Sequence, residues 1–122
     1  SKMTTELKNR VVNLEDKFGL FSSHWDPKII GDLNENHIKI AKIKGEFVWH
    51  HHEVDEMFLI IKGDVTIKLK DRDVHLKEGE MFIVPKYIEH KPVVPNGKEA
   101  YIMLVEPKGV VNTGSNTKSD LN

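Results

Sequence analysis

The sequence contains no cysteine, only two arginines and no long apolar run. Without cysteine, disulfides, thiolate metal sites and cysteine nucleophiles are excluded. Arg10 and Arg72 are the only guanidinium groups, so bidentate recognition of carboxylates or phosphates is scarce. No segment approaches the roughly 20 apolar residues of a membrane-spanning helix, and residues 1–6 lack the apolar stretch of a secretory signal. We therefore expect a cytoplasmic protein with no membrane partner, since a reducing compartment fits a chain without cysteine.

The charge balance also limits the classes of molecule that the chain can bind. The 122 residues carry 18 basic and 19 acidic side chains, for a net charge of −1. Such a chain has no broad basic field for a phosphate backbone, so no nucleic-acid partner is expected. The length suits one domain, and the 39% hydrophobic content is that of an ordinary globular protein.

Short segments rich in β-branched and aromatic residues dominate the sequence and predict an all-β fold. They are separated by Gly, Pro, Asn and Asp, which favour turns. The expected strands are 28–33, 37–44, 46–52, 56–62, 65–70, 74–77, 81–84, 90–94 and 100–105. This many short strands without a long helix indicates an antiparallel sandwich or a closed barrel.

Three segments carry less regular patterns. Residues 4–17 fit a short helix or an edge strand equally well. Within 37–44 the apolar positions change face, which predicts a bulge. Asn96-Gly97 is typical of a tight hairpin turn and predicts that the chain reverses there.

The domain organisation follows from these patterns. Residues 1–26 are expected to pack on or extend the barrel, and residues 27–107 to form it. Residues 108–122 are rich in Gly, Asn, Ser and Thr without an apolar period, which predicts a flexible tail.

A histidine-rich stretch provides the strongest functional signal. His50 and His52 are two residues apart, so on a strand both side chains point to the same face, and Glu56 follows four residues later. A second element, Pro85 to His90, adds another histidine. Imidazoles and a carboxylate on one face suit a divalent metal of intermediate softness. We interpret the two elements as one metal site.

These two elements resemble the two motifs of the cupin superfamily. The first reads Gly45, four residues, His50-x-His52, three residues, Glu56, six residues and Gly63. The second reads Gly79, five residues, Pro85, and then His90. Tyr87 stands where the family has glycine, and Val94 where it has asparagine. The fifteen residues between the motifs resemble the spacing of small single-domain members.

The resemblance implies a single-domain cupin-type β-barrel, a double-stranded β-helix or jelly roll. It also implies one divalent metal ion, held by His50, His52, Glu56 and His90. Imidazole and carboxylate ligands accept Fe, Mn, Ni, Zn, Cu or Co, so the identity of the metal stays open. Family members commonly dimerise, so a homodimer is expected.

Strand alternation predicts an apolar lining around the ligands, which suits a small organic molecule. Tyr87, in a loop at the barrel mouth, is a candidate proton donor, although a packing role fits it as well. The predicted lining residues are Val48, Phe58, Ile60, Phe82 and Val84.

The predicted function is that of a metal-binding protein for a small molecule, and two enzyme classes fit. One is a dioxygenase or oxidase, and the other is a sugar or keto isomerase. A non-catalytic module that binds a small ligand or a metal is the alternative from a different class.

Overall fold

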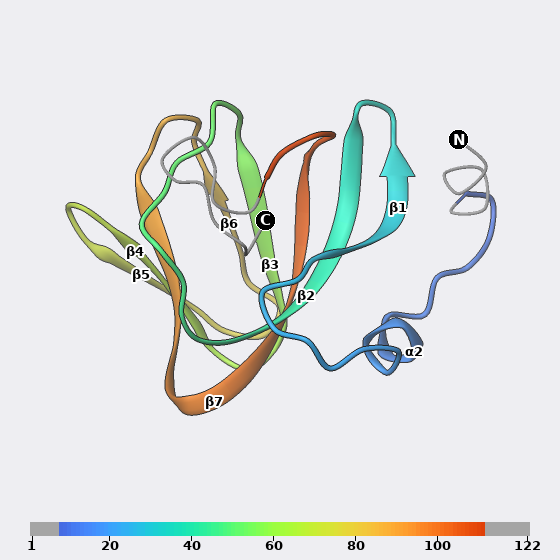
Figure 1. Ribbon diagram of the computed structural model, residues 1–122, viewed down its shortest axis with the longest axis horizontal. Helices are drawn as coiled ribbons and strands as arrows, with labels where there is room; N and C mark the ends of the chain where they lie inside the picture. Colours follow the sequence, from blue (N-terminus) through green and yellow to red (C-terminus); the bar gives the residue numbers. More distant parts are fainter. Residues whose placement is uncertain (1–7, 112–122) are drawn as a thin grey trace.

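The computed structural model describes residues 8–111 and shows an antiparallel β fold within that range (Figure 1). Every strand pair there is antiparallel, which confirms the all-β prediction. The elements are α2 (Leu14–Phe18), β1 (Lys28–Leu33), β2 (Asn36–Glu46), β3 (Glu56–Lys62), β4 (Val65–Leu69), β5 (Asp73–Leu76), β6 (Met81–Val84) and β7 (His90–Pro107).

The long strand β7 joins the two halves of the sheet. Its second half lies between β2 and β3 in the order β1-β2-β7-β3-β6, and its first half pairs with β4, which pairs with β5. In Figure 1, β7 bends sharply at the bottom of the molecule, so the two halves face each other around a common interior. The fold is therefore a barrel in which one strand belongs to both walls.

The predicted hairpin at Asn96-Gly97 is wrong. Lys44 pairs with Glu99 and Gly45 pairs with Val94, so β7 pairs antiparallel with β2 both before and after the dipeptide and does not reverse there. Asn96 and Gly97 both have positive φ, as a tight hairpin would require. Here the same backbone conformations form a bulge that bends the strand from one wall into the other.

The predicted strand over 46–52 is also wrong, because β2 continues through Gly45 and ends at Glu46. The segment after Glu46 is irregular, and it is joined to β7 by the Phe47 N–H, which donates to the Pro92 carbonyl, and by the bridge between His50 and His90. The bulge expected within 37–44 lies instead at the junction of Lys44 and Gly45.

Two apolar clusters explain the change of face along β2. Ala41 and Ile43 point into the barrel and join the main core. Ile40 points outward and packs with Phe18 and Ile30. Residues from 12 to 21, with α2 among them, thus cover the outer side of the sheet, and both faces of β2 are apolar for that reason. The helical alternative for the N-terminal segment holds at α2, where Asn13 caps the helix by accepting from the Asp16 N–H.

Both ends of the described chain reach one carboxylate. Lys8 and Lys108 lie 3.5 and 2.8 Å from Asp32, whose side chain is almost completely buried. Residues 108–111 therefore follow the barrel, whereas residues 112–122 of the predicted tail lie outside the described residues.

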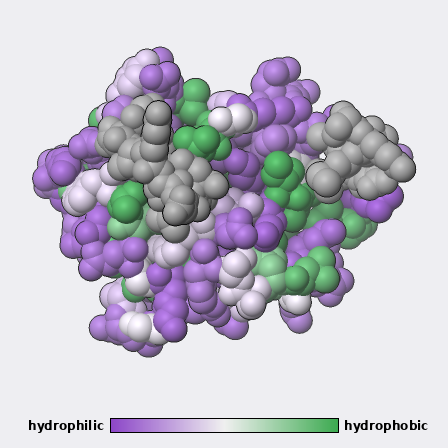
Figure 2. All heavy atoms as spheres, in the orientation of Figure 1, coloured by the Kyte–Doolittle hydropathy of each residue, from purple (hydrophilic) through white to green (hydrophobic). Residues whose placement is uncertain are grey.

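The outer surface is mainly polar in the view of Figure 2, where hydrophilic residues cover most of the described part and hydrophobic ones form scattered patches. Within residues 8–111, no helix has the length and hydropathy needed to cross a bilayer.

Gly63 and Gly79 offer a matched test of how closely the walls of the barrel approach. Both have positive φ, at 87° and 83°, but a Cβ on Gly63 would lie 2.9 Å from the Glu99 carbonyl oxygen, whereas one on Gly79 would meet nothing within 4 Å. We expect Gly79→Ala to lose about 1 kcal/mol of unfolding free energy, from backbone strain alone. Gly63→Ala should lose about 1–3 kcal/mol more, from the added clash. Urea unfolding measures both, and equal losses would contradict the close approach.

Candidate metal centre

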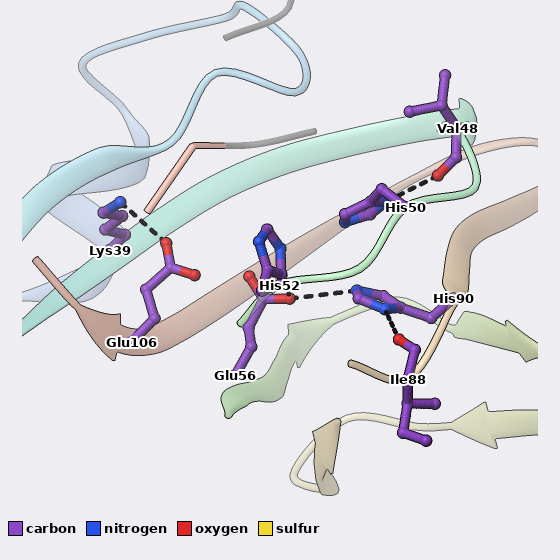
Figure 3. A network of polar contacts seen from close by, with 8 residues as sticks. All are labelled: Lys39, Val48, His50, His52, Glu56, Ile88, His90 and Glu106. Carbon is purple, nitrogen blue, oxygen red and sulfur yellow. Dashed lines mark hydrogen bonds and ion pairs between the residues drawn. The ribbon is translucent and has the colours of Figure 1, made fainter. Parts of the chain in front are cut away.

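Four side chains converge at one point inside the barrel (Figure 3). His50 and His52 come from the irregular segment after β2, Glu56 begins β3, and His90 begins β7. One ligand atom from each lies within 4.8 Å of all the others, and all four residues are buried. Residues far apart in the sequence thus form one cluster of three imidazoles and one carboxylate.

Backbone pairing explains why the irregular segment holds its shape. The His50 N–H donates to the His90 carbonyl and the His90 N–H donates to the His50 carbonyl, at 3.0 and 2.9 Å. The Tyr87 N–H donates to the His52 carbonyl at 2.7 Å. These bonds tie the two histidine elements together, so His50 and His52 share a direction without belonging to a strand. His51 lies 3.6 Å from Glu89 instead and is not part of the cluster.

Backbone carbonyls fix the orientation of two imidazoles. His50 Nδ1 donates to the Val48 carbonyl at 2.8 Å, and His90 Nδ1 donates to the Ile88 carbonyl at 2.9 Å. A carbonyl can only accept, so the proton lies on Nδ1 and the Nε2 lone pair is left free. This arrangement is common for histidines that bind metals.

Three polar atoms at the centre of the cluster have no hydrogen-bond partner among residues 8–111. They are His52 Nε2, Glu56 Oε1 and His90 Nε2, and all three are buried. Glu56 Oε1 lies 3.6 Å from His52 Nε2 and 3.4 Å from His90 Nε2. Each such buried atom costs about 1–3 kcal/mol when it has no partner. A cation between them would satisfy all three at once, so the donor set fits a metal ion.

Burial also sets the protonation of the histidines. Desolvation, followed by the neighbouring imidazoles, lowers the pKa of His50 to about 4 and that of His52 to about 3. Desolvation lowers the pKa of His90 as well. All three imidazoles are therefore neutral near pH 7, which is the form that binds a metal. Burial raises the pKa of Glu56, and a nearby cation would oppose that shift.

Sequence reasoning missed a buried pair beside Glu56. Lys39 on β2 donates to Glu106 on β7 at 2.9 Å, and both side chains are buried (Figure 3). Burial, then the neighbouring Glu56, raises the pKa of Glu106 to about 8 against the opposing effect of Lys39. Strand alternation could have placed Glu106 inside, since it shares a face with Ile102 and Leu104.

The five predicted lining residues do not all lie in the same part of the molecule. Phe58, Ile60 and Val84 belong to the buried core, and Phe82 packs against it. Val48 contributes its carbonyl to His50. Of the five predicted residues, Phe58 lines the cavity of about 40 Å³ beside His50. A separate cavity of about 250 Å³ lies beside His52 and is walled by residues 107–111 together with Glu53 and Val54.

Tyr87 departs from the motif in a way that the backbone explains. It adopts a φ of 69°, a conformation natural for glycine, and its side chain is 61% exposed. The loop therefore places a tyrosine in a backbone conformation that glycine adopts more easily. The role of Tyr87 as a proton donor stays a prediction. Val94, at the position of the family asparagine, is buried in the core.

Comparisons with known proteins agree with this geometry. The Cupin_2 family model, described as a cupin domain, matches residues 37–106, which is more than half of the chain. A cupin-2 domain containing protein from Shewanella frigidimarina NCIMB 400 superposes with a TM-score of 0.77 and 42% identity, over 80% of this chain and 95% of that one.

Two curated relatives match over parts of their length. The protein YdbB of Bacillus subtilis (strain 168) is 33% identical over 64 residues, which are 51% of this chain and 57% of YdbB. The 3-hydroxyanthranilate 3,4-dioxygenase of Xenopus tropicalis is 36% identical over 74 residues, which are 54% of this chain and 26% of that enzyme. The match thus spans about half of the first relative and a quarter of the second.

The neighbouring residues His50 and His51 test the candidate ligands. His50→Ala should weaken the binding of Co²⁺ or Zn²⁺ by more than about tenfold, because it removes one of four converging donors. His51→Ala should leave the affinity unchanged, because His51 lies outside the cluster. Titration of each purified variant with the metal measures the affinity. Equal affinity in the wild type and His50→Ala would contradict the assignment.

Glu106 should make the stability of the metal-free chain depend on pH. Because its pKa in the folded state is raised to about 8, folding must keep a proton on Glu106 that the unfolded chain releases above about pH 4.5. As the pH rises from about 4.5 to 8, the unfolding free energy of the wild type should therefore fall relative to that of Glu106→Gln. The expected slope is on the order of 1 kcal/mol per pH unit. Urea unfolding of both proteins across this range gives the difference. Parallel curves would show that Glu106 is not held protonated.

Proposed function

The chain belongs to the cupin-domain family, and on that basis we propose that it is a metal-dependent oxygenase that oxidises a small organic molecule with dioxygen. One observation carries the proposal: three imidazoles and a carboxylate converge in a buried site, and three of their ligand atoms have no hydrogen-bond partner in the described part of the chain. His50, His52, Glu56 and His90 would hold one divalent ion. Four protein ligands would leave one or two coordination positions for other molecules.

The chemistry of the donor set favours a redox-active ion. Bound there, Fe, Mn, Ni, Cu or Co would supply the electron-transfer chemistry that dioxygen requires, whereas Zn would act only as a Lewis acid. The protein contributes fixed, neutral imidazoles, a carboxylate and apolar walls that exclude bulk water. The Lys39–Glu106 pair beside Glu56 holds that carboxylate in a fixed electrostatic environment.

The dioxygenase relative supports oxygenation over sugar or keto isomerisation. The substrate is a separate question, because the match covers a quarter of that enzyme. Arg10 and Arg72 are both exposed, so no guanidinium reaches the cluster to clamp a carboxylate or a phosphate. We therefore propose a small substrate that binds through hydroxyl or carbonyl oxygens and occupies the cavity beside His52.

A homodimer stays part of the proposal, as does the cytoplasmic location expected from the sequence. Met81 and Ile83 on the edge strand β6 are each 49% exposed, next to the partly buried Met57 and Leu59 on β3. A second copy could cover this apolar face and protect the edge strand. Light scattering at micromolar concentration gives the mass that decides between monomer and dimer.

Metal content and oxygen uptake test the proposed function together. The chain is purified without added metal or a nickel column, and its metal is identified by elemental mass spectrometry. Reconstituted protein is then screened in an oxygen electrode against small hydroxylated substrates. We expect close to one equivalent of a redox-active metal and substrate-dependent oxygen uptake.

Two carboxylate variants provide the matched control. Glu56→Gln should lose most of the metal and the uptake, since it removes the anionic ligand. Glu15→Gln, at an exposed position on α2 that belongs neither to the cluster nor to the cavity beside His52, should keep both. Tight metal binding without uptake on any substrate would favour the non-catalytic module. Zinc alone, with turnover in the absence of oxygen, would favour an isomerase.

A further inference from the structure

A small apolar cavity inside the barrel touches the metal cluster on the side of His50. Its volume is about 40 Å³. It is lined by Trp25, Pro27, Ala41, Ile43, Phe47, His50, Phe58, Pro92, Ile102 and Leu104. We infer that this cavity is a binding site for dioxygen, separate from the site of the organic substrate. The inference rests on the proposed function for the identity of the gas.

The volume limits what the cavity can hold. An apolar cavity of about 150 Å³ holds benzene, and a volume of about 40 Å³ is too small for an aromatic ring or a sugar. The space exceeds the roughly 10–15 Å³ that one water requires. Molecules of two or three atoms are the ones that fit.

The polarity of the lining favours an apolar guest over water. His50 is the only residue in the lining with an ionisable side chain, and its Nδ1 already donates to the Val48 carbonyl. The indole N–H of Trp25 donates to the Lys44 carbonyl at 2.9 Å. A buried water needs two to four polar partners, and these walls provide at most the remaining nitrogen of His50. Dioxygen, which is apolar, loses nothing by leaving water for such a space.

The lining includes both partly buried residues and candidate ligands. Trp25 and Pro27 are only partly buried, and Trp25 stacks on Phe47 with ring centroids 4.7 Å apart. Phe47 in turn meets the ring of His50 edge-on at 5.3 Å. Phe58, also in the lining, has its ring centroid 6.2 Å from that of His90. Aromatic side chains thus lead from near the surface to two of the four candidate ligands.

The larger cavity has a different lining. It touches His52 and shares no lining residue with the apolar one. The two reactants would therefore approach through separate spaces, and the small one would admit gas without admitting the organic substrate.

Xenon tests the cavity directly, because it is an apolar atom that fills dry cavities and scatters X-rays strongly. Crystals of the purified chain, metal-free and metal-loaded, are pressurised with xenon. We expect xenon between Ala41, Ile43 and Phe58 in both forms. Ala41→Val, which adds two methyl groups to the wall, should abolish that peak. Val65→Ile enlarges the same core away from the cavity and should keep it.

Ordered water in the cavity in place of xenon, or no xenon in the wild type, would overturn the inference. So would a xenon peak that persists unchanged in Ala41→Val. In the active protein, Ala41→Val should raise KM for dioxygen by about threefold or more and leave kcat at saturating dioxygen and KM for the organic substrate unchanged. Unchanged KM for dioxygen would also overturn it. Xenon binding in a chain that shows no oxygen uptake would leave the cavity as a gas site and reject the proposed oxygenase.

Discussion

The burial of three imidazoles and one carboxylate at a single point is the constraint on which the rest of the structure depends. Removing these groups from water is unfavourable, and three of their atoms find no partner within the described chain. The surrounding barrel must therefore supply both the rigidity that holds them and the apolar packing that offsets their cost. The paired backbone bonds between His50 and His90, and the carbonyl of Val48, serve that purpose. A site of this kind costs stability in the metal-free chain and regains it when a cation binds.

The sequence was sufficient to predict the architecture and the four converging residues. Alternating apolar positions identified most strands within one or two residues, since a half-buried strand leaves a regular pattern. The motif spacing brought Glu56 and His90 to the same place although 33 residues separate them. His50 and His52 share a direction for a different reason than strand alternation, because the segment that carries them is held by bonds from His90 and Tyr87.

The features that sequence reasoning missed depend on contacts between distant residues. Asn96-Gly97 has the local conformation of a hairpin, and only pairing with β2 on both sides makes it a bulge. Lys39 and Glu106 look like solvated charges in the sequence, yet both are buried, and the Lys39 ammonium donates to the Glu106 carboxyl group. The cavity beside His50 is formed partly by Trp25 and Pro27, which precede the barrel strands and carry no periodic signal. A local sequence pattern indicates which face of a strand a residue occupies. It does not indicate which distant residue will contact it in the folded chain.

The position of β7 in the chain has a consequence for how the barrel is made. It is the last of the described strands, it belongs to both walls, and it carries His90. During synthesis, the edges of β2, β3 and β4 that pair with β7 therefore stay exposed until β7 has been made. Such edges pair readily with other chains, and pairing between segments distant in sequence is slow. One long strand thus closes the barrel. Until that strand has left the ribosome, the earlier strands are exposed to aggregation.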